Sequence, residues 1–459
     1  MATLSGQPLP QSPACSPVAE LCSCLGLFAV GIAINIALVQ CANAQFWLTG
    51  EEGSVAFKDV VFLRLRLQHC RYDTNLGGHI LYFLAYAVHP DPGLWYGRET
   101  KAVLMALAGP LTYLFARRLG LGFAASTFSG LCIFLFPGFS SFSWIGMEAG
   151  LELLFGGLAL YLAYGRSIWT WPLAAASLAF GILVYGGGAA FVVPVLGLIG
   201  WRVWCDRDRR SLLTALAAAG VFVGVLSLPS LWWVNTSHAY RGGGTIELVR
   251  APVLFLRLLY ESFYKPHSYY FISTSPALGG VLLLPLLAAG VYASCRKAFT
   301  WWPLWLLALG SIGLYSIATP TGVRRTIPLV FVASLLLGEV LEWAVQSRRL
   351  SKVAVVMVSL AVILLLGSQT LATARALSDQ RLVLPRDRDW IGTDMKSLLE
   401  NQIVVDPRTR EAVLELKNPI RAMCMLYLLQ DHSRRASDPL FSLGEIRAYY
   451  LTTDPEKFK

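Results

Sequence analysis

The sequence predicts an all-α, polytopic integral membrane protein with about 11 transmembrane helices, each of about 20 residues. Hydrophobic residues make up 55% of the 459 residues and charged residues only 14%, whereas soluble domains carry about 25% charged residues. Long uncharged runs recur along the chain, and the mean hydropathy is +0.55. Such runs form helices in lipid, because a helix satisfies its own backbone polar groups.

The first apolar run covers residues 21 to 44 and follows an N-terminal tail, residues 1 to 20, that contains no Lys or Arg. A secretory signal begins with a basic segment, so we expect this run to be a retained span. Residues 45 to 101 are more hydrophilic and form the predicted first outer loop. Within this loop, residues 52 to 68 and 75 to 88 each predict a short amphipathic helix at the membrane interface.

Further apolar runs extend the predicted transmembrane domain to residue 374. The uncharged stretch from 167 to 201 is too long for one ordinary span, and we expect its glycine run, residues 186 to 188, to form a turn between two spans. A second outer loop, rich in tyrosine and basic residues, is expected at 235 to 275. Residues 375 to 459 carry similar numbers of acidic and basic side chains and predict a small polar C-terminal region.

Short basic clusters set the expected orientation, because Lys and Arg in short loops favour the cytoplasmic side. The basic clusters fall at alternate ends of the predicted spans. They are Arg117–Arg118, Arg166, Arg202 with Arg207, Arg209 and Arg210, Arg296–Lys297, and Arg348–Arg349 with Lys352. The N-terminus is then cytoplasmic, and both long loops and the C-terminal region face outward. We expect a multi-pass protein of the bacterial inner or plasma membrane.

The formal net charge of +10 sits mostly in these clusters, which indicates topology and contact with anionic membrane lipids. Nothing in the distribution indicates a nucleic-acid partner. The nine cysteines are scattered, without a CxxC pair or the spacing of a metal site, so neither a disulfide framework nor a zinc site is predicted. No cofactor is predicted, although participation of a divalent metal stays open.

Several polar residues on the predicted outer face have the chemistry that a lipid-phosphate substrate requires. Glu51 and Glu52 end the first uncharged stretch, and a carboxylate beside apolar surface suits a general base. Arg324 and Arg325 can bind phosphate oxygens through two parallel hydrogen bonds each. Further candidate substrate-binding residues are Lys265, His267, Tyr269 and Glu148.

Each of these residues also has a purely structural interpretation. The acid pair is then a solvated boundary, and the two arginines are interfacial anchors. Glu148 and Glu152, one turn apart, complement a helix dipole. Tyr269 belongs to an aromatic belt, and His267 is structural.

The order of several motifs resembles the GT-C membrane glycosyltransferases, a group that includes protein O-mannosyltransferases and lipid A aminoarabinose transferases. The likeness covers roughly residues 21 to 345. The motifs that carry it are the acid pair, residues 115–120 (FARRLG), 136–140 (FPGFS), 147–148 (ME), 158–161 (LALY) and 321–328 (TGVRRTIP).

The resemblance implies a GT-C-like fold with two interfacial helices in the first outer loop and a cavity open to the outer face. It assigns Glu51 and Glu52 to the place of an Asp-Glu pair that activates or positions the acceptor. Glu148 takes the place of a second acid that orients the acceptor or a metal. The first position of the pair departs from the family pattern, because Glu51 stands where the family usually has Asp.

The expected function is transfer of a sugar from a polyprenyl-phosphate donor to a lipid, glycan or protein acceptor on the outer face. Two other functions fit a polytopic chain. One is a transporter or flippase, although we find no convincing internal repeat, and the acids gather near one face rather than at mid-span. The other is a non-catalytic membrane subunit built on the same scaffold, because fold alone does not determine function.

Overall fold

The computed structural model describes most of the hydrophobic part of the chain, and nearly all of the described residues are helical. The described ranges are 16–45, 76–88, 96–165, 167–231, 251–264, 275–317, 327–347, 351–379, 404–405 and 412–413. The first helices are α1 (Pro17–Gln45), α4 (Leu76–Val88), α5 (Tyr96–Ala106), α6 (Ala108–Arg118), α7 (Phe123–Leu135), α8 (Pro137–Ser143) and α9 (Glu152–Ala163). The predicted all-α membrane class is confirmed.

The second half of the described chain is also helical. Its elements are η2 (Ile168–Thr170), α10 (Trp171–Val184), η3 (Gly186–Phe191), α11 (Val192–Asp206), α12 (Arg209–Leu231), α14 (Ala251–Phe263), η5 (Val281–Leu283), α15 (Leu284–Cys295), α16 (Ala298–Ile317), α17 (Ile327–Gln346) and α18 (Lys352–Ser378). In the C-terminal region, β1 (Val404–Val405) and β2 (Ala412–Val413) form one short antiparallel pair.

The long apolar helices make the chain a multi-pass integral membrane protein. Among the described residues, five helices are long and apolar enough to cross a membrane, or six if α7 and α8 form one bent span. Four other apolar segments are shorter. The figure of about 11 spans therefore stays a prediction, because several uncharged runs are divided into shorter helices.

Proline and glycine cause these divisions. The apolar run from 102 to 116 is divided between α5 and α6 at Leu107, because Pro110 lacks a backbone N–H and its ring disfavours a continuous helix. Pro137 begins α8, which is bent by 59° from α7. The expected break at the glycine run is confirmed: α10 ends at Val184, and η3 leads into α11.

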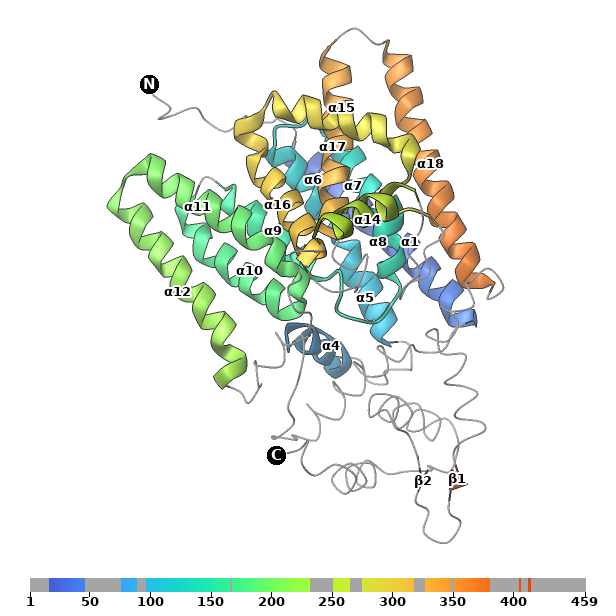
Figure 1. The fold of residues 1–459 in the computed structure, drawn as a ribbon, viewed down its shortest axis with the longest axis horizontal. Coiled ribbons are helices and arrows are strands. Elements are labelled where there is room, and N and C mark those ends of the chain that lie inside the picture. Colours follow the sequence, from blue (N-terminus) through green and yellow to red (C-terminus); the bar gives the residue numbers. More distant parts are fainter. Residues whose placement is uncertain are drawn as a thin grey trace.

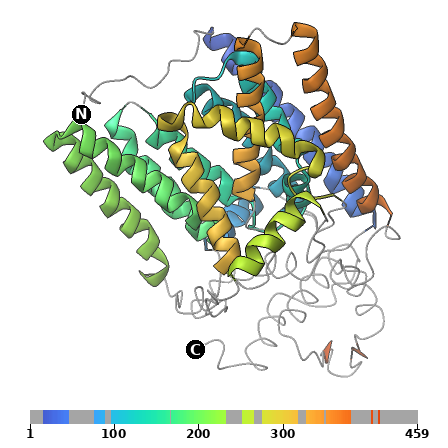
Figure 2. The ribbon, with the colours of Figure 1, turned by 45° about the horizontal axis from the view of Figure 1, so that its top comes forward.

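The helices pack through small residues, as is usual where no hydrophobic effect drives them together. A Cβ on Gly130 would lie 2.8 Å from the carbonyl oxygen of Gly109, so α6 and α7 meet nearly backbone to backbone. In Figure 1, α11 and α12 form a pair at one side of the molecule, and α1 and α18 lie at the other. Figure 2 shows the same arrangement from a second direction, with α17 between these groups.

Three of the basic clusters lie at one end of the molecule, which we call the basic end. Arg117 at the end of α6 pairs with Glu20 near the start of α1, with 3.2 Å between Nε and Oε1. Arg202 of α11 donates a 3.0 Å hydrogen bond to the carbonyl oxygen of Tyr164, just beyond α9. The Tyr164 hydroxyl donates to the carbonyl oxygen of Thr300, close to the Arg296–Lys297 cluster.

These contacts, with the Arg118 hydrogen bond to the Tyr161 hydroxyl, join helix ends that are far apart in sequence. The clusters at the ends of α6, α11 and α15 therefore lie at one end of the described structure. In Figure 1, α15 and the first turns of α18 lie toward the top, and α4 lies toward the bottom. We call the end that holds α4 the site end.

Candidate functional site

Glu148 is the one predicted site residue within the described part of the chain. Glu51, Glu52, Lys265, His267, Tyr269, Arg324 and Arg325 lie outside the described residues. The expected interfacial helix at 75 to 88 is present as α4, whereas the one expected at 52 to 68 also falls outside them. The site is therefore built here from Glu148 and its described surroundings.

Glu148 belongs to an irregular segment, residues 144 to 151, between α8 and α9. This segment is buried, and Glu148 itself is only 4% exposed. Gly150 turns the chain toward α9 with a φ of +99°, a backbone conformation that side chains other than glycine rarely adopt. Irregular backbone at membrane depth is tolerated where protein covers it and satisfies its polar groups.

Lys101 and Tyr82 satisfy the carbonyl groups of this segment. The buried Lys101 ammonium donates to the Met147 carbonyl oxygen at 2.6 Å, and it also donates to the carbonyl oxygen of Ala149. The Tyr82 hydroxyl donates to the same Met147 oxygen at 2.9 Å. The carbonyl groups on both sides of Glu148 are thereby fixed by α4 and α5.

α4 covers Glu148 through a pair of glycines. A Cβ on Gly78 would clash with Cγ and Cβ of Glu148, and a Cβ on Gly77 would lie 2.8 Å from the backbone nitrogen of Val184. The helix can approach this closely only because both positions lack a side chain. Tyr82 lies one turn beyond Gly78 on the same face, so its hydroxyl reaches the Met147 carbonyl group.

Glu152 supplies a second buried carboxylate at the start of α9. Its side chain is fully buried, and Oε2 accepts a 2.5 Å hydrogen bond from the Gly150 backbone N–H. Oε1 has no hydrogen-bond donor among the described residues. A Cβ on Gly187 of η3 would lie 2.7 Å from this oxygen. The Lys101 ammonium attracts the Glu152 carboxylate electrostatically.

Arg98 provides a second buried cation from α5, one turn before Lys101. Its guanidinium donates a 2.9 Å hydrogen bond to the Asn43 side chain of α1, and Cζ lies 5.2 Å from the centroid of the Trp144 ring. Gly97 and Gly146 allow the two backbones to approach: a Cβ on Gly146 would lie 2.8 Å from the Gly97 carbonyl carbon. Arg98 therefore connects α1, α5 and the Glu148 segment.

Two described helices end close in sequence to candidate residues that lie outside the described ranges. Asn43 lies two residues before the end of α1, and the chain reaches Glu51 six residues after Gln45. α17 begins at Ile327, two residues after Arg325. The Ile327 side chain lies 3.1 Å from the position of a Cβ on Gly150.

Sequence reasoning missed Tyr82, Arg98 and Lys101 as neighbours of Glu148. A signal for Lys101 was present, because a lysine directly before a long apolar run must find partners if it is drawn into the protein. The glycine pair in the first turn of an otherwise apolar helix was a second signal, since glycine is less favourable than alanine in a helix.

The described residues do not form a complete metal site. No group of three or more His, Cys, Asp or Glu side chains among them is close enough to hold an ion. Glu148 and Glu152 provide carboxylates, but Lys101 places a positive charge beside them. We therefore derive no chemical step through a metal ion.

Comparison with known proteins shows the fold. No family profile and no curated protein sequence matches the chain. Among solved structures, ArnT from Cupriavidus metallidurans in the apo state is similar with a TM-score of 0.55 at 15% identity, covering 94% of this chain and 89% of that one. The apo oligosaccharyltransferase from Archaeoglobus fulgidus is similar with a TM-score of 0.50 at 14% identity, covering 86% of this chain and 60% of that one.

Both proteins are membrane glycosyltransferases of the GT-C superfamily. Identities this low relate the chains through their folds and leave donors and acceptors undetermined. This chain therefore has an overall fold similar to that of these two membrane glycosyltransferases.

Proposed function

We propose that this protein is a membrane glycosyltransferase that moves a sugar from a polyprenyl-phosphate donor to a lipid, glycan or protein acceptor at the site end. The observation that carries the proposal is the burial of Glu148, Glu152, Arg98 and Lys101 together at this end. Burying charged groups inside a membrane protein is costly, and such groups mark functional sites by default. The GT-C fold supports the same class of reaction.

The proposed reaction forms one bond and breaks another at the anomeric carbon of the donor sugar. The acceptor oxygen bonds to that carbon, the bond from the carbon to the phosphate oxygen breaks, and polyprenyl phosphate leaves. Glu51 or Glu52 takes the acceptor proton as general base. Arg324 and Arg325 stabilise the charge of the leaving phosphate, with Lys265, His267 and Tyr269 as further contacts.

In this proposal Glu148 orients the acceptor. The Lys101 and Tyr82 hydrogen bonds fix the carbonyl groups around Glu148, so its carboxylate is held in place before substrate binds. Such fixed geometry matters because a misplacement of about 1 Å can reduce a rate about a hundredfold. A lipid-linked donor also suits a site at the membrane, because its hydrocarbon tail is already dissolved there.

The test is transfer of labelled sugar from polyprenyl-phosphate donors in membranes that contain the wild-type chain, Glu51→Gln or Glu52→Gln. We expect wild-type transfer and a loss of about a hundredfold or more in one of the two variants, in line with removal of a general base. The control is Glu99→Gln, which makes the same change of charge at an exposed position of α5. Equal transfer by all four chains would refute the proposed base, and absence of wild-type transfer with every donor would favour a transporter or a non-catalytic subunit.

A further inference from the structure

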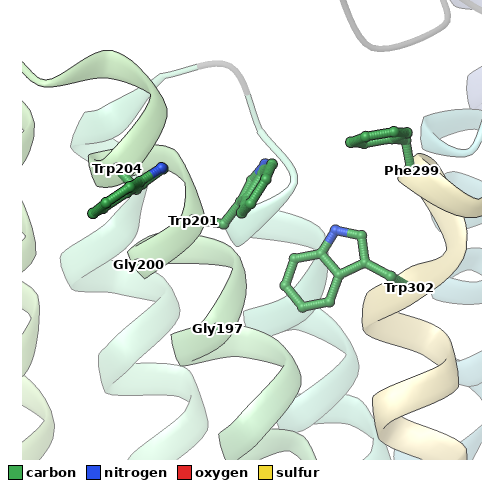
Figure 3. Close-up of a pocket in the computed structure, with 6 residues that line it drawn as sticks. All are labelled: Gly197, Gly200, Trp201, Trp204, Phe299 and Trp302. Carbon is green, nitrogen blue, oxygen red and sulfur yellow. The ribbon is translucent and has the colours of Figure 1, made fainter. Parts of the chain in front are cut away.

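A second feature lies at the basic end, far from Glu148: an open aromatic groove between α11 and α16. Figure 3 shows Trp201 and Trp302 facing each other across it, with Trp204 and Phe299 at its outer edges. The groove has a volume of about 530 Å³, within the range of about 300–1,000 Å³ that is usual for ligand sites. Its lining residues are Gly197, Gly200, Trp201, Trp204, Phe299 and Trp302.

Two glycines on α11 leave the floor of the groove open. A Cβ on Gly200 would meet nothing within 4 Å, and a Cβ on Gly197 would lie 3.4 Å from the Trp302 ring. Trp204 and Phe299 are 68% and 66% exposed. Because α11 belongs to a candidate span and α16 is apolar, this exposure is toward lipid. Tryptophan is enriched at this depth, where its ring meets both hydrocarbon and headgroups.

Positive charge borders the groove. The guanidinium of Arg207 lies over Trp204, with 5.6 Å from Cζ to the ring centroid, and Arg296 is exposed three residues before Phe299. Within the described part of the chain, neither arginine forms an ion pair. By contrast, Lys297 is already paired with Glu339, with 2.7 Å between Nζ and Oε1.

The turn between α11 and α12 keeps a positive excess. Asp206 and Asp208 are its acidic residues, and both already accept hydrogen bonds: Asp206 from the Ser211 hydroxyl and Asp208 from the Arg210 backbone N–H. The exposed basic residues of the turn are Arg207, Arg209 and Arg210. A ligand here therefore meets apolar aromatic surface on one side and unpaired cations on the other.

We propose that this groove binds one anionic phospholipid from the leaflet at the basic end. An acyl chain lies between Trp201 and Trp302 over Gly200, and the phosphate group lies toward Arg207. An anionic phospholipid combines a long apolar chain with a negative headgroup at this depth. A net negative headgroup is favoured over a zwitterionic one, because each basic residue near the membrane surface contributes about 1 kcal/mol of attraction to anionic lipid.

The test is native mass spectrometry of the purified protein in detergent, titrated with either palmitoyl-oleoyl phosphatidylglycerol or the corresponding phosphatidylcholine. We expect one phosphatidylglycerol molecule to bind at least about fivefold more tightly than phosphatidylcholine, as loss of one favourable charge contact implies. Gly200→Leu, which fills the groove, and Arg207→Gln, which removes the charge, should each weaken phosphatidylglycerol binding by about fivefold or more.

Two control variants match these changes elsewhere. Gly220→Leu is also on a lipid-facing helix, where an added Cβ meets nothing within 4 Å, and Arg375→Gln removes an exposed charge in the last turn of α18. Both should bind phosphatidylglycerol as the wild type does. Unchanged binding in Gly200→Leu and Arg207→Gln, or equal wild-type affinity for both lipids, would overturn the proposal. Melting temperatures equal to that of the wild type show that each variant is folded.

Discussion

Lys101 is the residue on which the geometry around Glu148 most depends. Its ammonium holds two carbonyl oxygens of the irregular segment and lies near the Glu152 carboxylate. Glu148 was predictable as a candidate because it follows the FPGFS motif and opens an apolar run. The role of Lys101 was not, since the sequence places it on a different helix and does not show which carbonyl groups it reaches.

Lys101→Met should destabilise the fold, because it removes the Lys101 hydrogen bond to the Ala149 carbonyl oxygen and leaves Tyr82 as the side-chain donor to the Met147 carbonyl oxygen. The expected loss is about 2 kcal/mol in the free energy of unfolding, measured as a lower melting temperature in detergent. Lys352→Met is the control, because Lys352 is exposed at the start of α18. Equal melting temperatures for the two variants would show that Lys101 does not support the segment.

At the scale of elements, α4 determines how the site is closed. Its position as a helix was predictable from the apolar run at 75 to 88, but its docking was not, because periodicity shows a face and not its partner. The structure supplies the partner: Gly77 and Gly78 bring α4 against Val184 and Glu148. The breaks between α5 and α6 and between α7 and α8 are caused by prolines, and a hydropathy profile alone does not predict such breaks.

Gly78→Ala tests this docking. Alanine favours the helix by about 1 kcal/mol relative to glycine, but its Cβ would clash with Glu148 and push α4 away. We expect sugar transfer to fall by about tenfold or more, given the sensitivity of rates to small misplacements. Gly26→Ala in α1 is the control, since a Cβ there meets nothing within 4 Å. Equal transfer by both variants would contradict the close contact.

At the scale of the whole molecule, an ion pair and two hydrogen bonds place the basic clusters of α6, α11 and the α15–α16 turn at one end. The buried charged centre around Glu148 lies at the other end. Hydropathy and the alternation of basic clusters were enough to predict this division. They did not fix the number of spans, because glycine and proline divide several apolar runs. The predicted orientation has the basic end in the cytoplasm.

Cysteine labelling tests this orientation. Cys205 is exposed at the basic end, and Glu99→Cys places a thiol at an exposed position of α5 at the site end. Both are studied in a chain whose other cysteines are replaced. A membrane-impermeant maleimide added to intact spheroplasts should label position 99 and leave Cys205 unlabelled until the membrane is permeabilised. The reverse pattern would place the site end in the cytoplasm.

The central claim is that the buried charged centre around Glu148 serves glycosyl transfer. The most direct measurement compares transfer from a polyprenyl-phosphate sugar donor by the wild type and by Glu148→Gln, which keeps the size of the side chain and removes its charge. We expect kcat/KM to fall by about a hundredfold, with an unchanged melting temperature. Transfer at the wild-type rate by folded Glu148→Gln would contradict the claim.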